Sequence, residues 1–202
     1  MNETPAIDFY FEYSSPYGYL ASELIGPLAD RHGVRVNWRP FLLGAVFKKT
    51  GGSPLVDQPL KGDYSRRDMM RTARLHDLPF QWPAKFPVFP VPCCRATYWV
   101  TEAHPEKTED LVHALYRGAW ATGRPVWETG TVLDIASETG LDRDAVEAGI
   151  GAPAIKERLK AETEAAMELG VFGSPFFLYR GEPFWGVDRL DQLDKWIETG
   201  GW

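Results

Sequence analysis

The turn Ser14-Ser15-Pro16 closes an apolar run, and a helix-like pattern begins directly after it. Serine is a preferred N-cap, and proline suits the first helical turn because its missing N–H costs nothing there. A helix start of this kind offers unpaired backbone N–H groups and a hydroxyl, which together stabilise an anion. The turn holds neither Cys nor His. We therefore expect Ser15 to donate a hydrogen bond rather than act as a nucleophile, although a simple cap would need no ligand at all.

Two strands and one helix are expected to position this turn. Residues 7–13 (IDFYFEY) mix β-branched and aromatic side chains, which is typical of a buried strand. Apolar residues at helical spacing follow Pro16, and Gly33 is the predicted C-cap. Residues 34–41 alternate in polarity and predict a second strand. Strand, crossover helix and strand in this order indicate a parallel β-α-β unit.

The rest of the chain is predicted to be mostly helical. Residues 42–50 predict a short helix, and residues 63–169 continue the helical pattern apart from a proline-rich connector at 83–92. The chain then changes character. Residues 176–179 and 183–185 predict a β-hairpin, and residues 188–197 predict an amphipathic helix with Asp188 as its N-cap.

The order of these elements indicates the fold class. The chain is predicted to be an α/β protein with a thioredoxin-like fold, β-α-β followed by β-β-α, into which a large all-helical insertion is placed. The expected division assigns residues 1–60 and 170–202 to the thioredoxin-like domain and residues 61–169 to the helical insertion domain.

Composition excludes several classes of function. A net charge of −6 argues against general nucleic-acid binding, which requires a basic surface. The segment MNETPAIDFYF lacks the pattern of a signal peptide, and no apolar stretch is long enough for a bilayer, so a cytoplasmic protein without membrane contact is expected. The adjacent Cys93 and Cys94 are predicted to be reduced and buried. No set of Cys, His and carboxylates has metal-ligand spacing, so no metal is expected.

Three blocks resemble the DsbA-like group, specifically the 2-hydroxychromene-2-carboxylate isomerases and the kappa-class glutathione transferases. The blocks are DFYFEYSSPYGYLA, WRPFLLGAVFKKTG and GVFGSPFFLYRGEPFWGVDRL, and the likeness extends over nearly the full chain. The resemblance implies glutathione as cofactor. It also implies cis-trans isomerisation of an aromatic carboxylate in aromatic hydrocarbon degradation, and a possible homodimer.

The resemblance gives the first turn a specific meaning. Redox members of this fold carry Cys-x-x-Cys where residues 15–18 (SPYG) stand here. Disulfide exchange requires a thiolate nucleophile and usually a resolving thiol, so it is not expected. By resemblance, Ser15 is the catalytic residue and hosts the thiolate of glutathione.

Four further residues are implied to contact glutathione. Ser174 precedes Pro175, which is cis in thioredoxin-like folds, and the backbone of Ser174 is expected to pair with the cysteinyl part. Val187 and Asp188 are expected at the γ-glutamyl end, where Asp188 would hold the ammonium group. Asp188 could also be only an N-cap, and Pro175 only a turn proline; neither role would need a ligand.

The residues implied to bind the substrate have weaker sequence signals than those implied to bind glutathione. Lys61 and Arg95 match basic family positions, and either would receive the carboxylate of an aromatic substrate, Arg95 with bidentate geometry. As solvated surface charges they would need no substrate. Phe47, Trp82 and Trp185 are candidates for an aromatic wall, although each is also typical of a core.

The sequence departs from the family at two places and leaves alternative functions open. The family commonly has Asn where Gly52 stands, and polar residues where Pro92-Cys93-Cys94 stand. One alternative is a kappa-like glutathione transferase that conjugates electrophiles. The other is a non-catalytic DsbA-like binding domain.

Overall fold

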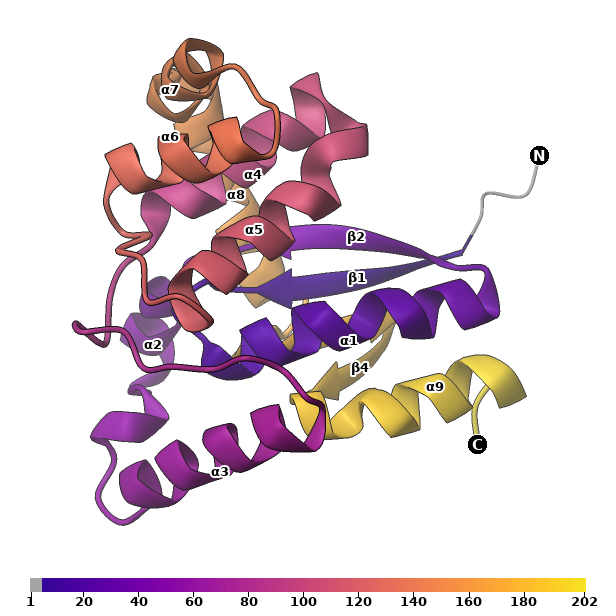
Figure 1. The fold of residues 1–202 in the computed structure, drawn as a ribbon. Coiled ribbons are helices and arrows are strands. Elements are labelled where there is room, and N and C mark those ends of the chain that lie inside the picture. Colours follow the sequence, from indigo (N-terminus) through magenta and orange to yellow (C-terminus); the bar gives the residue numbers. More distant parts are fainter. Residues whose placement is uncertain (1–4) are drawn as a thin grey trace.

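The computed structural model of the protein describes residues 5–202. Its central sheet has the strand order β2-β1-β3-β4. The strands are β1 (Ala6–Phe11), β2 (Arg35–Pro40), β3 (Phe176–Tyr179) and β4 (Glu182–Trp185). β1 pairs in parallel with β2 and antiparallel with β3, and β3 and β4 form a hairpin. The predicted thioredoxin-like order is confirmed (Figure 1).

Helix α1 (Pro16–His32) connects β1 to β2 and carries the candidate site at its N-terminus. Ser15 is its N-cap, and the left-handed Gly33, with φ 61°, ends it as predicted. β1 stops at Phe11, two residues before the predicted end of the strand. Glu12 and Tyr13 therefore belong to the bend that leads into α1.

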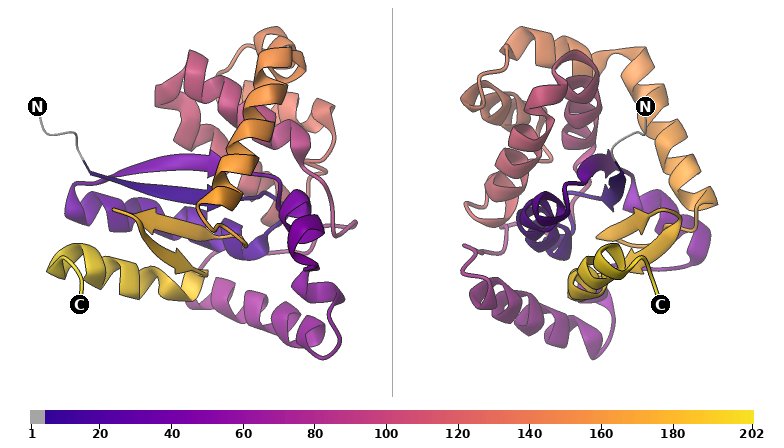
Figure 2. Two further views of the ribbon diagram at one scale, coloured as in Figure 1. Left: turned by 180° about the vertical axis from the view of Figure 1, so that it is seen from behind. Right: turned by 90° about the vertical axis from the view of Figure 1, so that its right-hand side faces the viewer.

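The other helices follow in two groups. Within residues 5–202 they are α2 (Leu43–Thr50), α3 (Lys61–Leu75), α4 (Val91–Ala103), α5 (Thr108–Trp120), α6 (Thr129–Glu138), α7 (Arg143–Gly151), α8 (Pro153–Glu168) and α9 (Leu190–Thr199). Short 3₁₀ turns lie at Leu55–Asp57, Pro105–Lys107 and Val187–Arg189. α4 to α7 pack on one another, whereas α3 packs against α1 and the first 3₁₀ turn, apart from them (Figures 1 and 2).

The alternation of side chains along the strands builds one apolar cluster on each face of the sheet. Phe9 and Phe177 point into the larger cluster, which α1, α4, α5 and α9 cover. Tyr10 and Phe176 point into the smaller one, which α2 and the end of α8 cover. Figure 2 shows α1 and α8 on opposite sides of the sheet. The division of the chain into residues 1–60 with 170–202 and 61–169 stays a prediction.

Two predicted helix starts are wrong. α4 begins at Val91, inside the predicted connector, because Pro92 occupies the first turn, where proline is tolerated. α9 begins at Leu190, and its N-cap position is held by Arg189 rather than Asp188. The chain leaves Gly186 at φ 108° and makes a 3₁₀ turn first, so the Asp188 carboxylate pairs with Arg189 at 3.0 Å instead of capping the helix.

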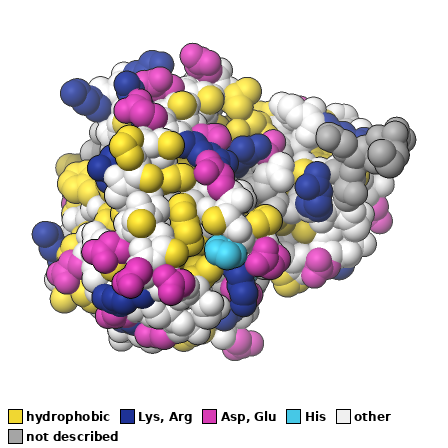
Figure 3. All heavy atoms as spheres, turned by 90° about the horizontal axis from the view of Figure 1, so that it is seen from above, with side chains coloured by type: hydrophobic (Ala, Val, Ile, Leu, Met, Phe, Trp, Pro, Cys, Tyr) yellow, Lys and Arg dark blue, Asp and Glu magenta, His cyan; other side chains and the backbone are white. Residues whose placement is uncertain are grey.

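The surface of the insertion carries charges of both signs. On the face in Figure 3, basic and acidic side chains are interspersed with apolar ones rather than separated into large patches. Within residues 5–202, no helix combines the length and apolar character needed to cross a membrane. In the same residues, no cluster of His, Cys, Asp and Glu has the arrangement of a metal site.

Candidate functional site

Ser15 links the start of α1 to the loop before β3. Its Oγ accepts a hydrogen bond from Gly18 N at 3.0 Å, which is the predicted cap, and donates to the carbonyl oxygen of Ser174 at 2.8 Å. The side chain is only 7% exposed. Ser174-Pro175 is a cis peptide bond, as expected from the resemblance. Two segments separated by 159 positions thus meet at one hydroxyl.

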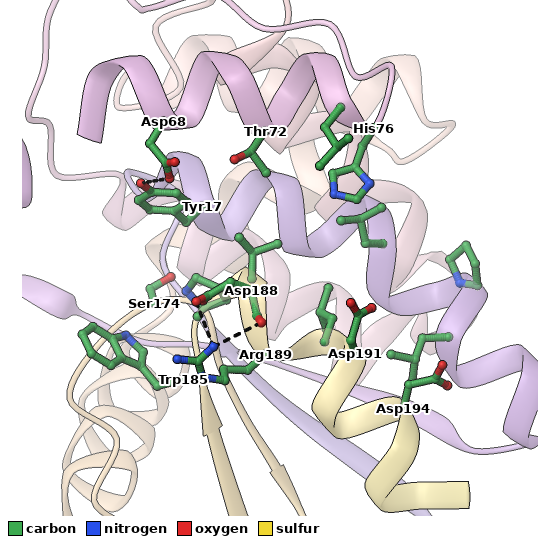
Figure 4. A pocket seen from close by; sticks show the side chains of 18 of the residues that line it. Tyr17, Asp68, Thr72, His76, Ser174, Trp185, Asp188, Arg189, Asp191 and Asp194 are labelled. Atoms are coloured by element: carbon green, nitrogen blue, oxygen red, sulfur yellow. Dashed lines mark hydrogen bonds and ion pairs between the residues drawn. The ribbon is translucent and has the colours of Figure 1, made fainter. Parts of the chain in front are cut away.

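A cavity of about 870 Å³ opens beside these residues, between α1, α3 and the segment from β4 to α9. Four of the predicted glutathione contacts lie in its lining, namely Ser174, Pro175, Val187 and Asp188. Figure 4 shows side chains from α3 on one side of the cavity and from the C-terminal segment on the other. The structure therefore brings these four residues together, next to Ser15.

Opposite charges lie side by side in the cavity wall. The Asp188 carboxylate is largely exposed and pairs with Arg189, so an ammonium acceptor and a carboxylate partner are adjacent (Figure 4). On the opposite side, the Tyr17 hydroxyl donates to Asp68 of α3 at 2.8 Å. Burial, together with this hydrogen bond, raises the pKa of Tyr17, so it is a neutral donor. This contact ties α3 to the first turn of α1.

Glu12 is a site residue that sequence reasoning missed. It is 3% exposed, and its carboxylate accepts hydrogen bonds from the backbone N–H (2.9 Å) and the hydroxyl of Ser14. Its own N–H donates to Ser174 Oγ at 3.0 Å. Burial raises its pKa to about 7, although the Ser14 hydrogen bonds act in the opposite direction. The available signal was the second acidic residue of IDFYFEY, at the end of the run where the strand meets the turn.

Two aromatic residues of α5 form hydrogen bonds with the backbone of the bend at Glu12 and Tyr13. Tyr116 donates its hydroxyl to the Glu12 carbonyl oxygen at 3.1 Å, and Trp120 Nε1 donates to the Tyr13 carbonyl oxygen at 2.9 Å. Both side chains are buried in the main core. The helical insertion thus supports the site directly, although no local pattern in the sequence indicates these long-range contacts.

The predicted substrate residues are more dispersed. Lys61 is exposed at the first residue of α3, and the half-buried Phe47 lies against Gly52, leaving little room for a side chain there. Arg95 is half-buried at the start of the second turn of α4, and its Nε is buried without a hydrogen-bond partner. These three do not line the cavity described above.

Of the candidate aromatic residues, only Trp185 lines the cavity, and it is 51% exposed. Trp82 packs edge-on against Trp120 at 5.8 Å, so it belongs to the packing of the connector instead.

No thiol of the protein is placed for chemistry within the described residues. Cys93 and Cys94 are free and completely buried, and burial followed by the nearby Glu12 raises the pKa of both thiols. A reactive sulfur at the Ser15 turn would therefore arrive with a ligand. A buried hydroxyl at a helix N-terminus and the Asp188–Arg189 pair suit a thiol that carries an amino-acid end.

Comparisons with known proteins identify the family and the fold. Residues 6–198 match the family model described as a DSBA-like thioredoxin domain. The 2-hydroxychromene-2-carboxylate isomerase of Pseudomonas putida is 30% identical over 94% of this chain and 92% of that protein. Glutathione S-transferase kappa 1 of Homo sapiens is 24% identical, with coverage of 95% and 92%. A solved structure of 2-hydroxychromene-2-carboxylate isomerase superimposes with a TM-score of 0.87 at 28% identity, covering 96% of this chain and 94% of that one.

Proposed function

The chain belongs to the family of DsbA-like thioredoxin domains that includes 2-hydroxychromene-2-carboxylate isomerases and kappa-class glutathione transferases, and on this premise we propose that it is a glutathione-dependent isomerase. Its substrate would be an aromatic carboxylate similar to 2-hydroxychromene-2-carboxylate. The observation that carries the proposal is the buried Ser15 hydroxyl at the start of α1, beside the Ser174 carbonyl, where a redox protein would place its cysteine.

Glutathione, when bound, would supply a thiolate that adds reversibly to a conjugated carbon of the substrate and so permits rotation about the former double bond. The protein's residues have the other tasks. Asp188 and Arg189 would hold the ammonium and carboxylate groups of the γ-glutamyl end. The backbone of Ser174 would align the cysteinyl part. The N-terminus of α1 would lower the thiol pKa.

The Ser15 hydroxyl has a single hydrogen, and that hydrogen is directed at the Ser174 carbonyl oxygen. To stabilise a sulfur anion, the hydroxyl must rotate away from this carbonyl. An N–H of the ligand can take its place there, because Ser174 then accepts a hydrogen bond from the ligand instead. Binding and activation of the thiol would in this way be coupled at one residue.

The proposal is tested by the products formed from 2-hydroxychromene-2-carboxylate and glutathione. We expect the trans isomer, with glutathione regenerated and none consumed. A stable thioether would instead identify a kappa-like transferase. Calorimetry that detects no glutathione binding would favour a non-catalytic DsbA-like domain, and would contradict the proposal.

Arg95 is the candidate to receive the substrate carboxylate, because its buried Nε has no partner. We expect Arg95→Gln to raise the KM for the aromatic carboxylate about 10-fold or more, the usual loss of a charge-assisted hydrogen bond, without changing glutathione affinity. Arg95→Lys should restore little, since lysine cannot form a bidentate pair. Lys61→Gln is the matched control. A larger effect on KM at Lys61 than at Arg95 would contradict this assignment.

Three further features complete the proposal. We infer a cytoplasmic location, consistent with two free cysteines, because thiols stay reduced there. The place in metabolism would be the breakdown of aromatic hydrocarbons. A homodimer is proposed from the family resemblance alone.

A further inference from the structure

Glu12 is a buried carboxyl group for which the proposed reaction has so far no use. Its side chain is 3% exposed, and none of the ion pairs in the described part of the chain includes it. A buried charge without a partner is costly, so such a group readily takes up a proton. Its pKa of about 7 agrees with this geometry.

Within residues 5–202, the surroundings of Glu12 contain hydrogen-bond donors but no cation that forms an ion pair with it. On the side of the insertion, the groups that face it are Cys93 and Cys94 of α4 and Tyr116 of α5. All three have raised pKa values, chiefly because they are buried, and are neutral. On the other side, the loop before β3 contributes the uncharged Ser174. The charge state of the carboxyl therefore depends on what binds at the adjacent turn.

Ser14 connects this carboxyl to the exposed side of the turn. Its hydroxyl donates to Glu12 Oε2, while the side chain itself is only half-buried. The next residue is Ser15, the proposed host of the sulfur. A hydroxyl that both donates and accepts is suited to pass a proton between a buried acid and a ligand.

We propose that Glu12 takes up the proton that a glutathione thiol gives up at the Ser14-Ser15 turn. This inference rests on the proposed glutathione site. In the transfer, the S–H bond breaks and its electron pair stays on sulfur, while the proton passes to Ser14 Oγ. Ser14 passes its own hydroxyl proton to Glu12 Oε2. The result is a thiolate, an intact serine and a neutral carboxylic acid, and the total charge does not change.

The energetic reason is that two negative charges would otherwise lie together in a poorly hydrated site. A thiolate at the turn disfavours an ionised Glu12, so its pKa rises further when the thiolate binds. When the proton passes from the thiol to Glu12 inside the complex, the site holds only one negative charge, on the sulfur. At any pH at which Glu12 is ionised before glutathione binds, the thiolate would therefore form without releasing a proton to solvent.

The test counts the protons released when glutathione binds, by calorimetry in buffers of different ionisation enthalpy. Near pH 6, Glu12 is already mostly protonated, so we expect about one proton released per thiolate formed. Near pH 8, Glu12 is mostly ionised and takes up this proton, so the release should fall to about zero. In Glu12→Gln, which cannot take up the proton, about one should be released at both pH values.

Glu23→Gln is the matched control, because Glu23 of α1 is also a mostly buried carboxylate but lies outside the Ser14-Ser15 turn. Burial alone would raise its pKa, but hydrogen bonds with His113 and Arg117 lower it, so it stays ionised. This variant should release protons as the native protein does. Difference infrared spectra of the native protein near pH 8 give a second readout, in which glutathione should produce the carbonyl band of a carboxylic acid that Glu12→Gln lacks.

The outcomes separate this inference from the proposed function. If the native protein binds glutathione as a thiolate, seen by its ultraviolet absorbance, but releases about one proton at both pH values, Glu12 is not the acceptor. The proposed glutathione site would then still stand. If no thiolate forms at all, the proposed function fails. The native protein alone supplies both the proton count and the infrared band, so the test does not depend on the folding of a variant.

Discussion

Ser15→Ala is expected to lower kcat/KM of the glutathione-dependent isomerisation by about 100-fold or more, the usual cost of removing one donor from an anion site. The variant loses the hydroxyl proposed to host the thiolate while Pro16 and the helix start remain. It also loses the cap on Gly18 N and the contact with Ser174, which should reduce the free energy of unfolding by about 1 kcal/mol. Steady-state kinetics and urea unfolding measure the two effects separately.

Asp142→Ala separates these two effects. Asp142 is the exposed N-cap of α7, and its carboxylate accepts from Ala145 N at 2.8 Å. Its removal should also cost about 1 kcal/mol of stability, but it should leave catalysis unchanged. Ser14→Ala tests whether the adjacent hydroxyl of Ser14 contributes to catalysis. If Ser15→Ala retained native turnover, Ser15 would have no part in the reaction, whatever its effect on stability.

The sequence predicted those parts of the molecule that depend on local patterns. The alternation in the strands, the Ser15 cap, the left-handed Gly33 and the hairpin all follow from neighbouring residues, and the structure confirms them. The cis bond before Pro175 and the grouping of Ser174, Val187 and Asp188 came from the family resemblance. The strands, the cap, the left-handed glycine and the hairpin are properties of short segments, whereas the grouping in the cavity was available only through the resemblance.

The missed features arise from contacts between distant segments. Glu12 has the appearance of a strand residue, and its burial follows only once α4 and α5 cover the bend. Asp188 has the right type for a cap, but the 3₁₀ turn before α9 leaves it one position ahead of the N-cap, which is Arg189. The role of Tyr116 depends on the packing of α5, because Tyr116 is 104 residues away from Glu12 in the sequence. No local pattern encodes such a pairing.

Gly18 gives the sharpest test of how the insertion supports the site. A Cβ at this position would lie 2.5 Å from the Tyr116 hydroxyl oxygen and 3.1 Å from Ser174 Oγ. Tyr116 is fully buried among aromatic rings and cannot easily move. We expect Gly18→Ala to reduce the free energy of unfolding by about 2 kcal/mol through overpacking, and to weaken glutathione binding because the turn must shift. Urea unfolding and calorimetry measure the two losses.

The cause is identified by removing the hydroxyl that the new methyl group would meet. Tyr116→Phe alone should cost about 1 kcal/mol, the value of its hydrogen bond to the Glu12 carbonyl. In the double variant with Gly18→Ala the contact with the Tyr116 hydroxyl is absent, so its loss of unfolding free energy should be smaller than the sum of the two single losses by about 1–2 kcal/mol. Gly130→Ala in α6 is the control, since no heavy atom lies within 4 Å of a Cβ there. Strict additivity would show that the Tyr116 hydroxyl does not set the space around Gly18. A positive coupling would establish that α5 and the Ser15 turn are built as one packing unit, so the insertion shapes the site that the thioredoxin-like elements present.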